Sequence, residues 1–247
     1  MSTEMNGLEK RPNRRGLWIG CGVIVIALIC LGSFVGFGGL VWLGLNTDDT
    51  PTASSTDIPQ NVTGAIPYLS VVQINAKFYD GGDLVTGWNG SGSIVSPDGY
   101  ILTNAHVVLP DKYFPVDALV VALTVGEDKQ PVETYYAEVM QADEDLDLAV
   151  LRITEDLSGN AISAGDLDLP YVNLGDADDL RLGDSVTILG YPGIGGSTIT
   201  LTGGEISGFT AQLPYGDRAF IKTSATIAGG NSGGLAADAD GRIVGVP

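Results

Sequence analysis

From about residue 66 onward, the chain consists of short runs of β-branched and aliphatic residues, each ended after a few positions by Gly, Asp or Pro. Pairs such as Val71-Val72, Ile94-Val95 and Ile101-Leu102 lie at the centres of these runs, and there is no long amphipathic helical pattern. Short strands separated by turn residues are typical of all-β barrels and sandwiches. We expect strands at 70–76, 90–95, 100–104, 119–125, 138–142 and 148–153, then at 185–189, 197–202, 204–209, 220–224 and 242–246.

Composition limits the partners that this chain can have. Its 247 residues are 44% hydrophobic and carry a net charge of −18. Residues 1–16 hold four basic and two acidic side chains and therefore carry a charge of +2. Residues 17–247 carry the other −20. Such an acidic, solvated exterior repels phosphate backbones, so we expect no nucleic-acid partner. The two cysteines, Cys21 and Cys30, both precede the β-rich part, which must be stable without a disulfide.

The N-terminal part predicts a membrane anchor. Residues 1–16 are polar and basic, and residues 17–45 are almost entirely apolar and uncharged. A bilayer core needs about 20 helical residues, so 17–45 is long enough to form a transmembrane helix. Basic residues before it and Asp48-Asp49 after it place the N-terminus in the cytoplasm. A cleaved signal peptide is the competing interpretation, but its apolar region is usually only about 7–15 residues long, which favours an uncleaved anchor.

Between the anchor and the β-rich part, residues 46–62 are rich in Ser, Thr, Asp and Pro and show no periodicity. Segments of this composition behave as flexible linkers. The expected organisation is therefore a cytoplasmic tail, a transmembrane helix, a linker and an extracytoplasmic domain over residues 63–247.

A serine surrounded by glycines is the first candidate for chemistry. Residues 229–234 read GGNSGG, with Ser232 at the fourth position. A serine hydroxyl becomes a nucleophile when a base removes its proton and nearby amides stabilise the oxyanion that forms. Glycines permit the positive φ angles of a sharp turn that directs two amides at one point. The same composition also suits an ordinary surface turn, so the segment alone does not decide between them.

The chain has one histidine, His106, at the end of an apolar run, and an acidic segment with Asp145 and Asp147 follows it. The order His, Asp, Ser is that of chymotrypsin-type triads. An α/β-hydrolase requires its histidine after the serine, and no histidine follows Ser232. Spacing does not separate Asp145 from Asp147, and either could be an exposed turn carboxylate.

Six segments in order resemble the HtrA/Deg family of trypsin-like serine proteases. They are residues 90–95 (GSGSIV), 98–108 (DGYILTNAHVV), 147–151 (DLAVL), 180–184 (LRLGD), 190–192 (GYP) and 229–234 (GGNSGG). The resemblance implies a chymotrypsin-like fold of two six-stranded Greek-key barrels. The first barrel would cover 63–153, a connecting strap 154–173 and the second barrel 174–247. In this family the catalytic aspartate directly precedes an apolar strand, which selects Asp147.

The resemblance also assigns roles to the site residues. Ser232 would be the nucleophile, His106 the general base and Asp147 its partner, and the amides of Gly230 and Ser232 would form the oxyanion hole. Thr226 and Ile227 would form the base of the primary substrate pocket. Neither is charged, so small or medium apolar residues are expected there in preference to Lys or Arg. Alternatively, Thr226 and Ile227 are ordinary strand residues. No metal or other cofactor is expected.

The family further implies an endopeptidase that hydrolyses unfolded or damaged extracytoplasmic proteins in protein quality control. Its members are commonly trimers, so a homo-oligomer is a further expected partner. The competing class is a catalytically inactive barrel that binds peptides or partner proteins. No PDZ domain follows the protease segment here, and residues 242–247 match the strand before the family's substrate-pairing segment. We therefore expect an incomplete second barrel and weak or absent activity, with a tendency to aggregate.

Overall fold

The computed structural model describes residues 66–194 and 196–247. The predicted cytoplasmic tail, transmembrane helix and linker, with Cys21 and Cys30, lie outside these residues. In the described part, no helix has both the length and the apolar character needed to cross a bilayer. The described residues form an all-β structure with one closed barrel and one open sheet, which fits the expected chymotrypsin-like fold.

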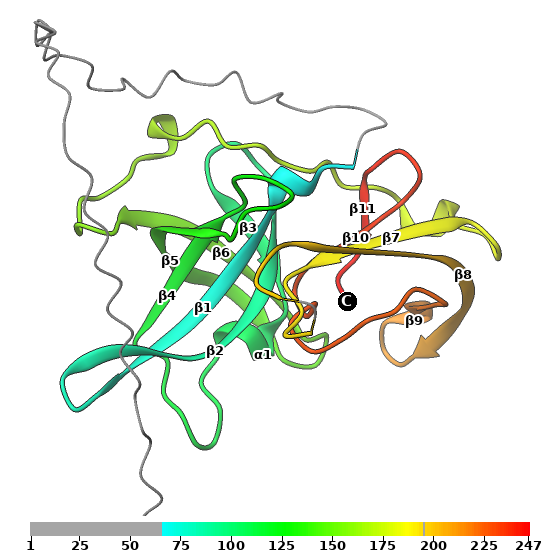
Figure 1. The fold of residues 1–247 in the computed structure, drawn as a ribbon. Coiled ribbons are helices and arrows are strands. Elements are labelled where there is room, and N and C mark those ends of the chain that lie inside the picture. Colours follow the sequence, from blue (N-terminus) through cyan, green and yellow to red (C-terminus); the bar gives the residue numbers. More distant parts are fainter. Residues whose placement is uncertain (1–65, 195) are drawn as a thin grey trace, which may run out of the picture. The chain divides into compact units, whose positions relative to one another are not determined.

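Six antiparallel strands close the first barrel in the order β1-β2-β3-β6-β5-β4. Their bounds are β1 Val71–Asp80, β2 Asp83–Ile94, β3 Tyr100–Thr103, β4 Ala118–Leu123, β5 Val132–Asp143 and β6 Leu148–Asp156. The chain leaves β3 through a short helix, α1 (Ala105–Val108), and crosses the barrel before it returns in β4 beside β1. This crossover places α1, which carries His106, at the end of β3 (Figure 1).

Local sequence explains the tightest turn of this barrel. Asp80 pairs with Asp83, and the two residues between them, Gly81 and Gly82, have φ angles of 60° and 101°. Two-residue hairpins of type I′ need positive φ at both central positions, and glycine reaches these angles without strain. The interior of the barrel is filled by aliphatic side chains, with Ile74, Ile94 and Leu151 fully buried. Burial of each such side chain stabilises the fold by about 1.5–3 kcal/mol.

The second sheet has five strands in the order β11-β10-β7-β8-β9 and is open. The bounds are β7 Ser185–Gly190, β8 Thr200–Gln212, β9 Gly216–Thr223, β10 Leu235–Ala237 and β11 Ile243–Gly245. Two strand predictions are wrong here. The separate strands expected at 197–202 and 204–209 are one long strand, β8, and the three-residue strand β10 lies within a segment for which the sequence predicted none.

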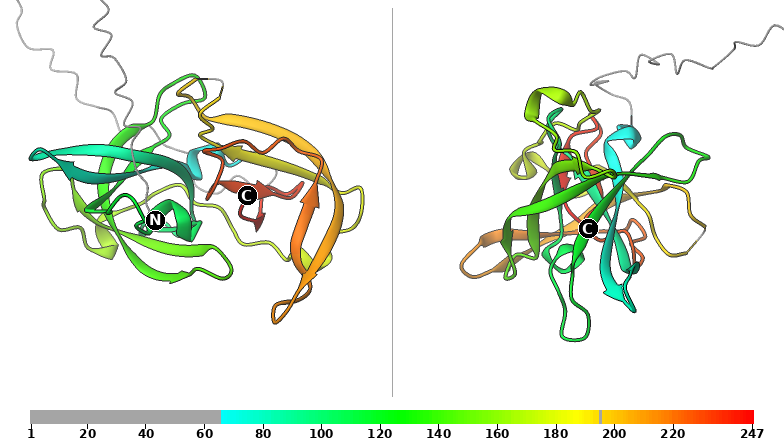
Figure 2. Two further views of the ribbon diagram at one scale, coloured as in Figure 1. Left: turned by 90° about the horizontal axis from the view of Figure 1, so that it is seen from below. Right: turned by 90° about the vertical axis from the view of Figure 1, so that its left-hand side faces the viewer.

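The described residues also form three short 3-10 helices. One, η1 (Tyr68–Ser70), directly precedes β1, and two, η2 (Ala164–Asp166) and η3 (Ala177–Asp179), lie in the connection between the two sheets. The connection is hydrogen-bonded to both the barrel and the open sheet. The amide of Val172 donates to the carbonyl of Ile94 in the barrel at 2.9 Å, and Gly175 donates to Ile243 in β11 at 2.7 Å. A buried apolar cluster joins the two sheets and includes Val71 from β1 and Leu235 from β10. Figure 1 and the left view of Figure 2 show the two sheets side by side.

Candidate active site

His106 is held on α1 at the edge of the barrel. The helix is anchored by the indole of Trp88, whose Nε1–H donates to the carbonyl of Val107 at 2.9 Å. Asn104 occupies the N-cap position, where its side chain would normally accept a helix amide, but it makes no capping hydrogen bond. The amide of His106 instead donates to Oδ1 of Asp147 at 2.9 Å. A residue 41 positions away therefore supplies the cap of this helix.

Asp147 also contacts the imidazole. Its Oδ2 lies 2.6 Å from Nδ1 of His106, and both side chains are about half exposed. An ionised carboxylate can only accept hydrogen bonds, so in the neutral ring Nδ1 carries the proton and Nε2 has the lone pair. Asp145, the alternative left open by spacing, does not contact the histidine, and its amide donates to Oδ1 of Asp143 at 3.0 Å.

Asp147 has an unusual backbone. Its φ of 53° is the only positive φ among the described non-glycine residues. Such left-handed geometry is uncommon for a residue with a Cβ and is found where surrounding contacts hold it in place. One of these contacts is the side chain of Asn104, whose Nδ2 donates to the Asp147 carbonyl at 2.7 Å.

The serine turn is formed by the predicted glycine-rich segment and is packed against the barrel. Gly230 and Gly233 have φ angles of 100° and 82°. A Cβ on Gly233 would lie 2.1 Å from Oγ1 of Thr103 and 2.2 Å from the carbonyl of Ser91, so only glycine fits. The amide of Ser91 donates to the carbonyl of Ser232 at 2.8 Å, which pins the turn to β2.

The amides of this turn divide into two kinds. Asn231 donates to Ala228 at 3.0 Å, and Gly234 donates to Asn231 at 2.8 Å. The amides of Gly230 and Ser232, the predicted oxyanion donors, have no acceptor among the hydrogen bonds of the described residues.

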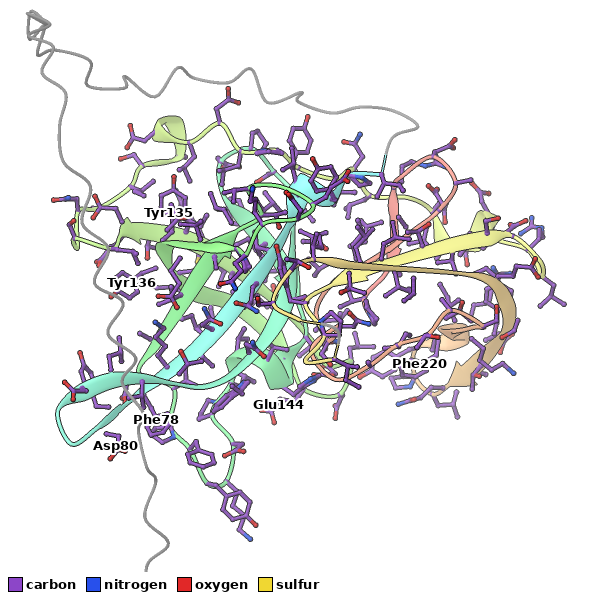
Figure 3. All side chains as sticks on the ribbon, in the orientation of Figure 1. Phe78, Asp80, Tyr135, Tyr136, Glu144 and Phe220 are labelled. Carbon is purple, nitrogen blue, oxygen red and sulfur yellow. The ribbon has the colours of Figure 1, made fainter. Side chains whose placement is uncertain are left out.

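His106, Asp147 and Ser232 line one cavity of about 560 Å³. No hydrogen bond joins the Ser232 hydroxyl to the imidazole within the described chain; such bonds are often long in free proteases and shorten when substrate binds. The walls are mainly apolar and are supplied by the second sheet, including Val186, Ile188 and Phe220. Phe220, on β9, is labelled in Figure 3, as is Glu144 in the turn that leads to Asp147.

The two predicted pocket residues differ in position. Ile227 lines the cavity and is 49% exposed, whereas Thr226 does not line it, and its carbonyl accepts from the Thr202 hydroxyl at 2.7 Å. Both belong to the loop between β9 and the serine turn, so the alternative that they are strand residues is wrong. Sequence reasoning missed Ser91, Asn104 and Phe220 as residues of the site.

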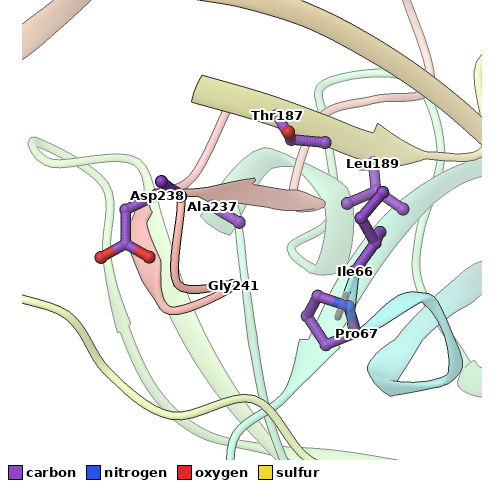
Figure 4. A pocket seen from close by; sticks show the side chains of 8 residues that line it. Ile66, Pro67, Thr187, Leu189, Ala237, Asp238 and Gly241 are labelled. Carbon is purple, nitrogen blue, oxygen red and sulfur yellow. The ribbon is translucent and has the colours of Figure 1, made fainter. Parts of the chain in front are cut away.

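A second pocket, of about 80 Å³, lies between residues 66–67 and strands β7 and β10 (Figure 4). Its one carboxylate, Asp238, already accepts from the guanidinium of Arg242 at 2.8 and 2.9 Å. The described residues contain no cluster of His, Cys, Asp or Glu that could hold a metal ion. The larger cavity is therefore the better candidate for an active site.

Comparison with known proteins identifies the family of the chain. Residues 90–246 match the trypsin-like peptidase domain. The chain belongs to the trypsin-like peptidase family. It is 37% identical over 158 residues to a probable periplasmic serine endoprotease, DegP-like, of Halomonas elongata, covering 64% of this chain and 28% of that protein. It is 34% identical over 213 residues to the human serine protease HTRA4, covering 81% of this chain and 40% of the relative.

A DegP-like endoprotease of Brucella suis is also 37% identical, over 161 residues that cover 64% of this chain and 26% of the relative. The expected family, the trypsin-like serine peptidases, is therefore confirmed, and the relatives include DegP-like and HTRA serine proteases. The chain spans well under half the length of these relatives.

Proposed function

We propose that this member of the trypsin-like peptidase family hydrolyses peptide bonds through Ser232, His106 and Asp147. The observation that carries the proposal is the 2.6 Å contact between Asp147 and Nδ1 of His106, which together with Ser232 line one cavity. This contact leaves Nε2 of the imidazole free to act as a base.

In the proposed reaction, Oγ of Ser232 attacks the carbonyl carbon of the substrate while Nε2 of His106 takes the hydroxyl proton. The tetrahedral oxyanion is stabilised by the unpartnered amides of Gly230 and Ser232. The C–N bond then breaks, the imidazolium gives its proton to the leaving amine, and an acyl-enzyme remains. Water repeats these steps with the imidazole as base and releases the acid and the free hydroxyl.

The proposed substrates are unfolded or damaged proteins. The cavity beside Ser232 has apolar walls, and Ile227 and Phe220 each expose nearly half of their surface. Apolar side chains that are buried in folded proteins become accessible when a protein unfolds, and they would find a matching surface here. No cationic side chain is expected to be preferred at the cleavage site.

We also propose that the peptidase acts outside the cytoplasm and is anchored by residues 17–45. The uncharged apolar sequence of that segment supports an anchor, and two of the relatives are described as probable periplasmic proteins. The test is protease treatment of cells whose outer layers have been opened. Degradation of residues 63–247 without lysis of the inner membrane is the expected result, and protection until lysis would contradict it.

The second candidate function is a catalytically inactive barrel that binds peptides, and the open five-stranded sheet is the observation that favours it. A fluorophosphonate probe separates the two functions because it needs a reactive serine and oxyanion donors but no extended substrate. The enzyme predicts covalent labelling that is lost in Ser232→Ala and in His106→Ala. Unlabelled protein that is folded by circular dichroism would favour the binding module.

A further inference from the structure

The side-chain amide of Asn104 links the two turns that carry the aspartate and the serine. Its Nδ2 donates to the carbonyl of Asp147 at 2.7 Å, and its Oδ1 accepts from the amide of Gly233 at 2.6 Å. The partners are one acceptor and one donor, so they fix the orientation of the amide group. Asn104 is 6% exposed, so both hydrogen bonds are shielded from water.

The first hydrogen bond acts on the aspartate. Asp147 must keep a φ of 53° to present its carboxylate to both the amide and the imidazole of His106. A residue with a Cβ keeps this angle only when neighbouring contacts enforce it. The bond from Asn104 to the Asp147 carbonyl fixes the peptide plane that follows this angle. Without it, the carboxylate would lose part of its alignment with the imidazole.

The second hydrogen bond acts on the serine. Gly233 directly follows Ser232, and its amide belongs to the peptide plane that contains the Ser232 carbonyl. That amide also lies 3.2 Å from the carbonyl of Pro247, but the bond to Asn104 is shorter at 2.6 Å. A buried acceptor on the barrel therefore sets the direction in which the chain leaves the serine.

We propose that Asn104 is a positioning residue that aligns Asp147 and Ser232 with His106, which lies two positions after it in the chain. The inference rests on the proposed function, because it concerns the efficiency of the same three residues. Asn104 also lines the cavity, but the role proposed for it does not depend on contact with the substrate. It acts through the two backbone groups that its amide holds. Because Asn104 is the N-cap residue of α1, it connects the helix that carries His106 to the turns that carry Asp147 and Ser232.

The first measurement is made on the imidazole and needs no catalysis. His106 is the only histidine, so its ring nitrogens give one unambiguous set of signals in long-range ¹H–¹⁵N correlation spectra. In the wild type, Asp147 holds the proton on Nδ1, so the neutral ring is expected as the Nδ1–H tautomer. Asn104→Ala is expected to raise the fraction of the Nε2–H tautomer, which is favoured in a free imidazole.

The second measurement is the rate constant of fluorophosphonate labelling. Misplacing reacting groups by about 1 Å can slow a reaction roughly 100-fold, so Asn104→Ala is expected to label at least about tenfold more slowly. Asn104→Asp keeps an acceptor for Gly233 but loses the donor to Asp147. It is expected to show the tautomer change of Asn104→Ala with an intermediate labelling rate, and it serves as the second variant should Asn104→Ala fail to fold.

The matched control is Asn75→Ala. Asn75 is 7% exposed and lies in β1, where its Nδ2 donates to Glu133 at 2.9 Å, away from the cavity. This variant is expected to lower the melting temperature but to leave the tautomer and the labelling rate unchanged. The inference is overturned if folded Asn104 variants keep the wild-type tautomer, or if Asn75→Ala slows labelling as much as they do. If the wild type shows no labelling, the proposed function fails, and the tautomer still decides the role of Asn104.

Discussion

The hydroxyl of Ser91, in β2 of the barrel, donates a 2.7 Å hydrogen bond to the carbonyl of Gly230 in the serine turn. The same hydroxyl accepts from the amide of Tyr191 at 2.8 Å, and Ser91 is fully buried. Its backbone amide donates to Ser232. One residue of the first barrel therefore holds the carbonyls of the same two residues whose amides are the predicted oxyanion donors.

The first prediction concerns this hydroxyl. Ser91→Ala leaves a buried amide and a buried carbonyl without a partner, which is expected to lower the free energy of unfolding by about 1–3 kcal/mol. Ser93→Ala is the matched control, because Ser93 is also fully buried in β2 but its hydroxyl has no hydrogen-bond partner. Urea denaturation measures both variants. An equal loss of stability in the two would contradict the role of Ser91.

Two adjacent glycines in β8 test the geometry of the second sheet. A Cβ on Gly204 would lie 2.2 Å from the backbone nitrogen of Ala225, whereas a Cβ on Gly203 would meet nothing within 4 Å. Gly204→Ala is therefore expected to destabilise the protein by about 1–3 kcal/mol or more, because the neighbouring backbone must shift. Gly203→Ala should be neutral within about 0.5 kcal/mol. Thermal or urea denaturation measures the stability of both variants. If Gly203→Ala were less stable than Gly204→Ala, the strand register would be refuted.

Alkaline pH provides a third test. Burial raises the pKa of Tyr191, an effect partly offset by its hydrogen bond with Thr124. Above pH 10, the ordinary tyrosine pKa, the unfolded chain releases this proton while the folded chain retains it. The contribution of Tyr191 to stability is therefore complete below pH 10 and declines as pH rises through the raised pKa, by at most about 1.4 kcal/mol per pH unit.

Tyr191→Phe removes this ionisation. The variant is expected to be less stable than the wild type at pH 8 by about 0.5–1.5 kcal/mol because it loses a buried hydrogen bond. The difference in unfolding free energy should shrink from pH 9 to pH 11. Tyr113→Phe is the control, because Tyr113 is 74% exposed. A difference between wild type and Tyr191→Phe that stays constant over this range would contradict the assignment.

The fourth prediction concerns cleavage preference. Ile227 lines the cavity beside Ser232, and its neighbour Thr226 does not. Ile227→Ala enlarges the cavity and is expected to shift kcat/KM toward larger apolar residues by about tenfold, the effect typical of one or two methylene groups. Thr226→Ala should leave the preference unchanged. A peptide library measures both profiles, and a shift confined to Thr226→Ala would show that another surface binds the substrate.

Much of this architecture could be predicted from local sequence. The strand Leu148–Asp156 could be recognised from its run of aliphatic residues. The expected strands at 70–76 and 90–95, in contrast, left out the hairpin that turns at Gly81-Gly82. The short strand Leu235–Ala237 was missed because three residues carry no periodicity, and one of its two partners, β7, lies far upstream in the chain. The pair of glycines at 203 and 204 suggested a break within β8, yet close packing on Ala225 requires a glycine there.

The site shows the same division. His106 could be selected because it is the one histidine of the chain, and Ser232 because a pair of glycines lies on each side of Asn231-Ser232. Asp145 and Asp147 could not be separated by spacing, because the choice depends on a φ of 53° that tertiary contacts impose on Asp147. Ser91 and Asn104 carry no local signal of their roles, since each acts by hydrogen bonds to turns more than 40 residues away. Such roles appear only when the barrel brings those turns together.

The most direct test of the account is a crystal structure of the protein after reaction with a fluorophosphonate. The account predicts one adduct, with Oγ of Ser232 bonded to phosphorus and a phosphonyl oxygen about 3 Å from the amides of Gly230 and Ser232. His106 should lie beside the adduct with its Nδ1 still on Asp147. An adduct on another residue, or a phosphonyl oxygen directed away from both amides, would contradict it.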